Sequence, residues 1–328
     1  MDRRRFIRIS AAAAGAALLP FAMPREAARA HLIEWRGTSL GAVATVRIHH
    51  GDRIAAQQLI RTVAVEARRL ERVFSLYLPD SALCELNGRG VLIFPPGELS
   101  DLLAVCDQLW HATDGLFDPT VQPLWQCYAE HFAEANRDSK SPPAPKLKEA
   151  LELVGWKYVR FDPYKVVFNR LGMGMTLNGI AQGYVTDRIV ELLRSAGIES
   201  SLVDLGEIRG LGRHPDGRPW NVAVESPSGE IDKGKFISLV NKAIATSSAA
   251  GFQFDEQGRC NHLFNPLTGK CAHPERSITV VAATAVMADA LSTAFALMSE
   301  NQIRLVLSRL DMVQTYITTD NATRTVTF

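Results

Sequence analysis

The sequence of 328 residues lacks several patterns that identify common classes of protein. It has no Cys-x-x-Cys pair, so neither a zinc ribbon nor a thioredoxin-type site is indicated. It also lacks the Gly-x-Gly-x-x-Gly fingerprint of Rossmann dinucleotide sites. No internal repeat is present, and no apolar run of about 18 residues occurs outside the N-terminal region. A solenoid and a membrane-spanning body are therefore not expected.

A strong charge bias is missing too. The formal net charge is +1, and no basic stripe alternates with aromatic residues, so no nucleic-acid partner is predicted. Apolar residues make up 47% of the chain, which is enough to bury a large core.

The N-terminal region has the features of an export signal. Residues 2–8 read Asp-Arg-Arg-Arg-Phe-Ile-Arg, an apolar stretch rich in Ala and Leu follows, and Ala28-Arg29-Ala30 offers a cleavage site. We interpret residues 1–30 as a twin-arginine signal that exports a folded, cofactor-dependent protein to the periplasm. The alternative is a signal that stays uncleaved and retains the protein at the inner membrane. The folded part is then expected to span residues 31–328.

Five cysteines are an odd number for an exported chain. Cys260 and Cys271 lie close enough in sequence to pair with each other, whereas Cys106 falls on an apolar helix face. None of them is predicted to be a nucleophile.

The sequence from 278 to 298 contains the strongest chemical signal. Residues 278–284 are apolar and β-branched, which predicts a buried strand, and residues 288–298 predict a buried helix. Asp289 and Thr293 are four apart, so their side chains point the same way on that helix. A buried carboxylate is costly unless something compensates its charge. Either Asp289 bonds only to local backbone while Thr293 back-bonds along the helix, or the two form a two-oxygen corner for a hard cation.

Irregular alternation of strands and helices predicts an α+β fold with mixed sheets. The expected elements are an Asp52-capped helix to residue 73, a short helix from 81 closed by Asn87-Gly88, a helix starting at Ser100, irregular backbone over 117–125, a hairpin over 158–168, a strand-to-helix bend over 175–187, and strands at 43–48, 201–204, 220–224 and 236–244.

Two further residues allow two interpretations each. Asp118 precedes Pro119, so it forms either a plain Asx turn or part of a polar pocket. His262 lies beside the turn at Asn265-Pro266, and it is either a structural residue or a general base. Ser247 precedes it in the chain but lies in no Gly-x-Ser-x-Gly elbow, which disfavours a serine hydrolase.

Taken together, the motifs resemble those of the ApbE family of FAD:protein FMN transferases over essentially the whole mature chain. The resemblance rests on eight separated motifs in order: residues 37–42, 74–87, 115–121, 178–187, 203–206, 245–247, 262–269 and 288–294.

The resemblance implies a single T-fold-like α+β domain that binds FAD and Mg²⁺, or alternatively Mn²⁺. Such an enzyme moves FMN from FAD to a Thr or Ser hydroxyl of a partner flavoprotein, which can be a membrane-bound redox subunit, and releases AMP. The motif positions imply that Asp289, Thr293 and the carbonyl of Gly179 bind the cation, and that His262 acts beside the reacting phosphates. The implied flavin contacts are Leu40, Tyr77, Leu116, Phe117, Asp118, Thr176, Gln182 and Leu263.

Two positions depart from the family pattern. The family often has an acidic residue where this chain has Thr176, and Lys or Glu where it has Gln182, so flavin affinity or acceptor choice can differ. The Asn178–Tyr184 motif together with the export signal resembles the branch associated with nitrous-oxide reduction.

Three other functions are compatible with the same sequence. The site could hydrolyse FAD to FMN and AMP with water as the acceptor, or bind and deliver flavin without catalysis. A scaffold for a reductase complex would bind no flavin at all.

Overall fold

The computed structural model describes residues 31–134, 141–225, 231–320 and 322–326. The predicted export signal, residues 1–30, lies outside this part of the chain. Within the described part, no helix is both long enough and apolar enough to cross a membrane.

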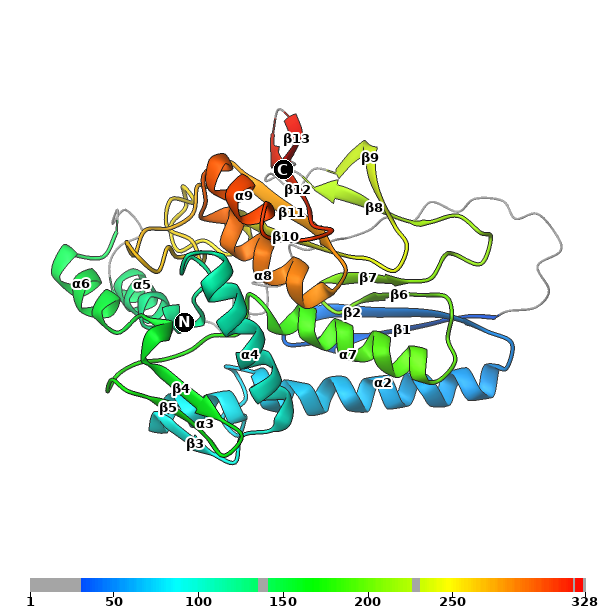
Figure 1. The fold of residues 1–328 in the computed structure, drawn as a ribbon, viewed down its shortest axis with the longest axis horizontal. Helices are drawn as coiled ribbons and strands as arrows, with labels where there is room; N and C mark the ends of the chain where they lie inside the picture. The colour runs from blue at the N-terminus through cyan, green and yellow to red at the C-terminus, as the bar shows by residue number, and fades with distance from the viewer. Residues whose placement is uncertain (1–30, 135–140, 226–230, 321, 327–328) are drawn as a thin grey trace.

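An eight-stranded sheet forms the centre of the molecule (Figure 1). Every pairing between its described strands is antiparallel. In sheet order the strands are β1 (His31–Ser39), β2 (Ala42–His50), β6 (Ser201–Asp204), β7 (Ile208–Leu211), β10 (Ala243–Ser248), β11 (Ser277–Ala282), β12 (Gln314–Thr319) and β13 (Ala322–Val326). All six residues of β11 are buried, including the polar Ser277 and Thr279, so the strand does not alternate between a buried and an exposed face.

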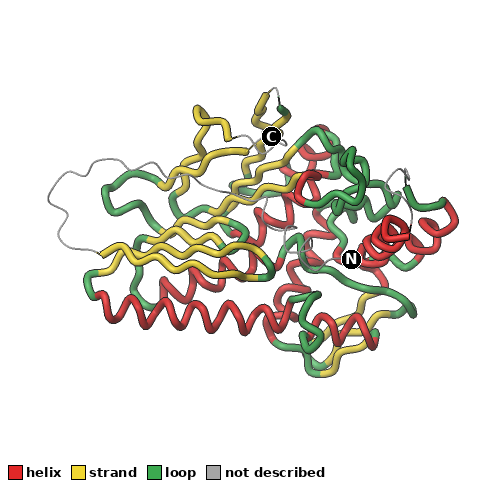
Figure 2. The backbone as a smooth tube through the Cα atoms, turned by 180° about the vertical axis from the view of Figure 1, so that it is seen from behind, coloured by secondary structure: helices red, strands yellow, loops and turns green. Residues whose placement is uncertain are grey.

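Three helices cover one face of this sheet: α2 (Arg53–Phe74), α7 (Ala181–Ser195) and α8 (Ala285–Ala296). Figure 2, from behind, shows the sheet backed by these helices. The hairpin of β8 (Trp220–Glu225) and β9 (Ile231–Leu239) packs Trp220, Val222 and Ile237 on a second apolar cluster that includes Ile244 and Val281. Because α8 lies among the sheet, α7 and the core, nine of its residues are buried, and most of its residues are correspondingly apolar.

The remaining elements form two smaller regions beside the main layer. One contains α3 (Ala82–Arg89), α4 (Gly97–Ala112) and the small sheet β3–β5–β4, with β3 at Val91–Ile93, β4 at Val159–Asp162 and β5 at Lys165–Phe168. The other packs α5 (Gln122–Glu134) and α6 (Ala144–Glu152) against a segment that contains Phe254, Cys260 and Phe264. Helix α9 (Glu300–Leu307) precedes β12, and short 3-10 turns lie at Pro119–Val121, Trp156–Tyr158 and Ala249–Gly251.

Several local predictions are confirmed, and with them the α+β class. Asp52 caps α2, because its Oδ1 accepts from the backbone N–H of Ile54 at 2.7 Å and of Ala55 at 3.1 Å. The hairpin over 158–168 forms as β4 and β5, and α7 ends before Gly197, whose φ is +81°. The buried strand and helix predicted over 278–298 appear as β11 and α8.

Other predicted boundaries are wrong. Helix α4 begins at Gly97 after Pro96, so Ser100 lies inside it. Helix α3 continues through Asn87 and ends at Gly90, where φ is +70°. Asn87 is instead used as a bridge: its amide donates to Met175 O at 2.8 Å and accepts from Met175 N at 2.7 Å.

The segment from 117 to 125 is more regular than predicted, and two other segments are less so. Pro119 starts a 3-10 turn and Pro123 lies in the first turn of α5, where a missing N–H costs nothing. The strand expected over 236–244 is split into β9 and β10 by a turn at Asn241, whose φ is +51°. Residues 175–180, expected to begin as a strand, have no strand pairing.

Residues 37–41, Gly-Thr-Ser-Leu-Gly, match the letters of a nucleophile elbow but form a hairpin turn. Ser39 pairs with Ala42, so Leu40 and Gly41 alone connect β1 to β2. Both have positive φ, as a two-residue hairpin turn requires. The strand-to-helix geometry of a nucleophile elbow is therefore absent here.

Helices α7 and α8 cross closely at Gly183. A Cβ added to Gly183 would lie 2.4 Å from the carbonyl oxygen of Ala285, a distance that forces the backbones apart. The glycine is therefore required for the spacing of the two helices.

We predict that Gly183→Ala lowers the free energy of unfolding by about 3 kcal/mol and the Tm by roughly 5 °C or more, because the new methyl group clashes with backbone. Thermal unfolding followed by circular dichroism measures this. Gly88→Ala is the control, since this helical glycine has open space and alanine should raise stability by up to about 1 kcal/mol. Equal effects of both substitutions would contradict the close crossing.

Candidate functional site

The N-terminus of α8 is held by a side chain from α7. Asp187 Oδ1 accepts from the backbone N–H of Ala285 at 2.8 Å, and Oδ2 accepts from that of Val286 at 2.9 Å. Arg209 donates to Oδ1 at 2.6 Å. Thr284, which occupies the N-cap position, makes no capping bond with its side chain. Asp187 therefore fixes α8 against α7, a role that the sequence analysis missed.

One turn further along α8, Asp289 faces the N-terminus of α7. Its side chain is buried, and Oδ2 accepts from the backbone N–H of Gly183 at 2.9 Å. That N–H belongs to the first turn of α7 and has no partner within the helix. Burial, together with the nearby charge of Asp187, raises the pKa of Asp289 to about 7. No basic side chain among the described residues bonds to this carboxyl group.

Thr293 brings a second oxygen to the same corner. Its Oγ1 donates to the carbonyl oxygen of Gly179 over 3.5 Å, at the limit of a hydrogen bond. A Cβ on Gly179 would lie 2.9 Å from that Oγ1, so the close approach needs glycine. The back-bond within this turn of α8 is made by Ser292, which donates to Asp289 O at 2.9 Å. The predicted back-bonding role of Thr293 is therefore wrong.

Ser247, at the end of β10, extends this polar corner. Its Oγ is 2.7 Å from Ser292 Oγ and 3.4 Å from Thr293 Oγ1. In the sequence, Ser247 stands out only as a disfavoured nucleophile and as part of the 245–247 motif, and nothing there assigns a role to Ser292. Because Ser292 lies three residues after Asp289, helical periodicity alone could have placed it on this face.

Two further acidic side chains near this corner are hindered from ionising. Burial raises the pKa of Asp204 to about 7. It also raises the pKa of Glu207 well above its ordinary value, with added repulsion from Asp289 and Asp204. A cation bound nearby would favour the ionised forms of these carboxyl groups.

The oxygen donors at this corner fit a hard divalent cation. A carboxylate, a hydroxyl and a backbone carbonyl are the ligand types that Mg²⁺ prefers, and so few protein ligands leave positions for phosphate oxygens. The described residues contain no group of three or more His, Cys, Asp and Glu side chains arranged around a metal. The predicted set of Gly179, Asp289 and Thr293 is of a different kind, and it stays a prediction.

The bend before α7 connects several predicted flavin contacts. Tyr77 hydrogen-bonds through its side chain to Asn178, the residue before Gly179. Thr176 Oγ1 accepts from Asn178 N at 3.3 Å, and Thr176 N donates to Pro119 O at 2.8 Å. Tyr77 and Thr176 are thus anchored to the same bend as the proposed cation ligand.

Asp118 has its oxygens occupied by neighbouring donors. Oδ1 accepts from Thr120 N at 2.8 Å and from Thr120 Oγ1 at 2.6 Å, and Oδ2 accepts from Trp156 N at 2.9 Å. These bonds form the Asx turn, and the flavin contact expected of Asp118 stays a prediction. Leu116 and Phe117, which precede it, are buried in the main core.

Leu40 and Gln182 occupy tightly constrained positions. Leu40 has φ of +49°, an uncommon value for leucine, and its backbone N–H donates to the carboxylate of Glu71. The Gln182 side chain lies over Gly206, where an added Cβ would come within 2.6 Å of Gln182 Cδ. Strained or crowded residues of this kind often belong to functional sites.

His262 comes from the segment between β10 and β11. Its Nδ1 lies 3.2 Å from Phe252 O, and because a carbonyl only accepts, Nδ1 carries the proton. Nε2 then keeps a free lone pair, and burial lowers the pKa of the ring, which favours this neutral form. Leu263, the next residue, is buried, and its backbone N–H donates to Asn261 Oδ1 at 3.1 Å. Among the described residues, no hydrogen bond links His262 to Asp289, Thr293 or Gly179.

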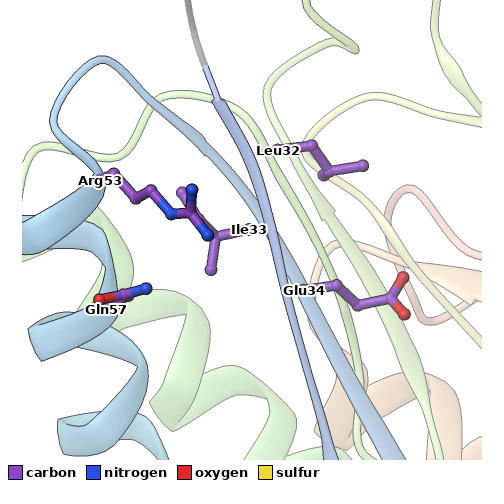
Figure 3. A pocket seen from close by; sticks show the side chains of 5 residues that line it. All are labelled: Leu32, Ile33, Glu34, Arg53 and Gln57. Atoms are coloured by element: carbon purple, nitrogen blue, oxygen red, sulfur yellow. The ribbon is translucent and has the colours of Figure 1, made fainter.

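A separate hollow of about 400 Å³ lies between the start of β1 and the first turn of α2. Figure 3 shows Ile33 pointing toward Arg53 and Gln57, whereas Leu32 and Glu34 point to the other side of the strand. Glu34 is paired with Arg47 and Arg36. The hollow is at the opposite end of β1 from Leu40, so it is not part of the site built around α7 and α8.

Comparison with known proteins gives one family and several relatives. Residues 40–317 match the model of the ApbE family. The FAD:protein FMN transferase of Haemophilus influenzae is 29% identical over 88% of this chain and 88% of its own length. That of Treponema pallidum is 30% identical over 82% of this chain and 78% of its own length.

Solved structures of the same family share the fold. The apo flavinyl transferase ApbE of Pseudomonas stutzeri superposes with a TM-score of 0.77 and 25% identity, covering 92% of this chain and 96% of its own. The ApbE protein of Thermotoga maritima gives 0.78 and 27%, over 90% and 97%. These similarities confirm the fold expected from the sequence.

We predict that the buried carboxyl of Asp289 makes the cation-free protein less stable as the pH rises. The pKa of this carboxyl is about 7 in the folded protein and 3.8 in the unfolded chain. The protonated carboxyl therefore adds its full share to the free energy of unfolding below pH 3.8, and this share is lost as the pH rises through 7. Between pH 6 and 8 the loss should be about 1 kcal/mol.

The measurement is urea unfolding in the presence of a chelator at both pH values, for the wild type and for Asp289→Asn. The amide oxygen introduced by this substitution can still accept from Gly183 N, but the amide does not titrate. The variant should therefore lose the part of the pH dependence that comes from Asp289 and keep the part that comes from Asp204 and Glu207. An unchanged pH slope in the variant would show that Asp289 titrates normally.

Proposed function

The chain belongs to the ApbE family, and we propose on that basis that it transfers the FMN part of FAD to a hydroxyl group of a protein acceptor. The observation that carries this proposal is the family match over residues 40–317. The relatives named FAD:protein FMN transferase support it, because they align with most of this chain and most of their own length.

We further propose that Asp289, Thr293 and the carbonyl of Gly179 hold Mg²⁺. The position of Thr293 Oγ1, 3.5 Å from the carbonyl oxygen of Gly179, and the only partly compensated charge of Asp289 support this assignment. When bound, the cation would neutralise charge on the diphosphate of FAD and on the departing AMP. Gly183 N–H keeps Oδ2 of Asp289 oriented, so little rearrangement is needed on binding.

The transfer step exchanges one P–O bond for another. The acceptor hydroxyl oxygen attacks the FMN phosphorus, the bond from that phosphorus to the bridging oxygen breaks, and AMP leaves with the bridging oxygen. The hydroxyl proton must be removed during the attack. We assign this role to Nε2 of His262, since Nδ1–H is committed to Phe252 O and the neutral ring is favoured by burial.

The flavin itself is proposed to lie along the bend before α7. Tyr77 and Thr176 are both bonded to Asn178 there, and Phe117 and Leu263 supply buried apolar surface nearby in the core. Thr176 and Gln182 are uncharged in this chain, so recognition at these positions depends on hydrogen bonds and shape instead of ion pairing.

We also propose that the acceptor is a periplasmic or membrane-bound flavoprotein with a target Thr or Ser. The support comes from the twin-arginine pattern in residues 1–30, which would deliver the folded enzyme to that compartment.

We predict that His262→Ala reduces FMN transfer by at least roughly 100-fold, because proton removal by a positioned base contributes about 10²–10⁴. FAD affinity should change by less than about threefold. Mass spectrometry of an acceptor domain incubated with FAD and Mg²⁺ follows the covalent FMN adduct, and fluorescence titration gives the affinity. His273→Ala, at an exposed histidine downstream in the same segment, is the control and should retain transfer.

Equal losses of transfer and FAD binding in His262→Ala would show that the histidine has a structural role.

The same assay separates the rival reactions. Free FMN and AMP without an adduct on the acceptor would indicate an FAD pyrophosphatase, and intact FAD would indicate a carrier.

We predict that Thr293→Val raises the Mg²⁺ concentration for half-maximal transfer by roughly tenfold or more, because it removes a ligand while keeping the shape of the side chain. Thr293→Ser retains the hydroxyl and should stay near the wild type. Activity measured over a Mg²⁺ series tests this, with thermal unfolding to confirm that both variants fold. Identical Mg²⁺ dependence in the two variants would exclude Thr293 as a ligand.

A further inference from the structure

Two cysteines meet beside the segment that carries His262. The thiols of Cys260 and Cys271 are hydrogen-bonded to each other, and Cys271 Sγ also donates to Asn261 O at 3.3 Å. Cys260 is buried, whereas Cys271 is only partly buried and can be reached from solvent. Both belong to the cluster packed around Tyr128 and Phe264.

The backbone on either side of the two thiols is already fixed. Phe254 N donates to Cys260 O at 2.8 Å, and Phe264 pairs with Cys271 in an antiparallel bridge. Ala272 N donates to Leu263 O at 2.8 Å. Bonding the two sulfur atoms would therefore join parts of the chain that are already neighbours in the folded protein.

We propose that Cys260 and Cys271 form a reversible disulfide that closes the segment from 260 to 271, and with it His262 and Leu263. This modification is independent of flavin transfer, since it depends only on the two thiols and an oxidant. The oxidant is a disulfide, RSSR, carried by a small thiol or by a thiol oxidase.

The exchange balances in two steps. The thiolate of Cys271 attacks RSSR, forming a mixed disulfide and releasing the first RSH. The thiol of Cys260 then attacks the Cys271 sulfur, forming the Cys260–Cys271 bond and releasing the second RSH. The protein loses two electrons and two protons, and both pass to RSSR. The contact with Cys260 lowers the pKa of Cys271, which suits it to the first attack.

The other cysteines are poorly placed to compete. Cys106 is fully buried in the main core, and Cys84 donates to Ser75 O at 3.5 Å in a different part of the fold. Cys127 borders the same cluster as the pair, so it is the one rival. It therefore supplies the matched control.

The test uses the full chain, treated with oxidised glutathione or with dithiothreitol. After oxidation, alkylation under denaturing conditions should label two fewer thiols than in the reduced protein, and a peptide map should contain the Cys260–Cys271 linkage. The oxidised protein should unfold roughly 5 °C higher, because the bond restricts the unfolded chain. Cys127→Ser should behave like the wild type.

Cys260→Ser and Cys271→Ser should each lose the linkage and the shift in Tm upon oxidation. Full alkylation of all cysteines after oxidation would overturn the proposal, and so would a linkage that includes Cys127. Since the readouts are mass and unfolding temperature, a failure here is distinguishable from a failure of the proposed transferase activity, which is measured by the FMN adduct.

Discussion

The structure of the site depends on one buried interaction, in which the carboxylate of Asp289 faces the N-terminus of α7. A charge in this apolar helix would be very costly alone, and the N–H of Gly183 compensates only part of it. The remainder raises the pKa of the carboxyl group to about 7, and a bound cation would compensate the charge of its ionised form. Oxygen atoms from two separate chain segments, α8 and the bend before α7, are held there by helix packing.

This arrangement requires α7 and α8 to lie unusually close together. Gly183 permits the approach, and Asp187 maintains it by capping α8 from the side of its neighbour. The same residues therefore stabilise the helix pair and align the proposed ligands. A change in the crossing would move Asp289 relative to Gly179, which links the stability of the core to the chemistry of the site.

The proposed base has a different kind of support. His262 is positioned by Phe252 and by a satellite cluster around Tyr128, not by the helix pair. The segment that carries His262 has little regular structure, so fewer backbone hydrogen bonds hold it in place than hold α8. A covalent bond between Cys260 and Cys271 would add a restraint where the fold supplies few.

The sequence alone determined the helix and strand around Asp289, the α+β class and the family, because hydrophobic periodicity, capping residues and motif order are local properties. It misplaced the start of α4 and the course of residues 236–244, where proline and turn geometry set the boundaries. Which groups meet was decided only by the tertiary structure: Thr293 and Gly179 are 114 residues apart, and Asp289 and Gly183 are 106 apart. No local pattern encodes such contacts, because they arise from the packing of α7 on α8.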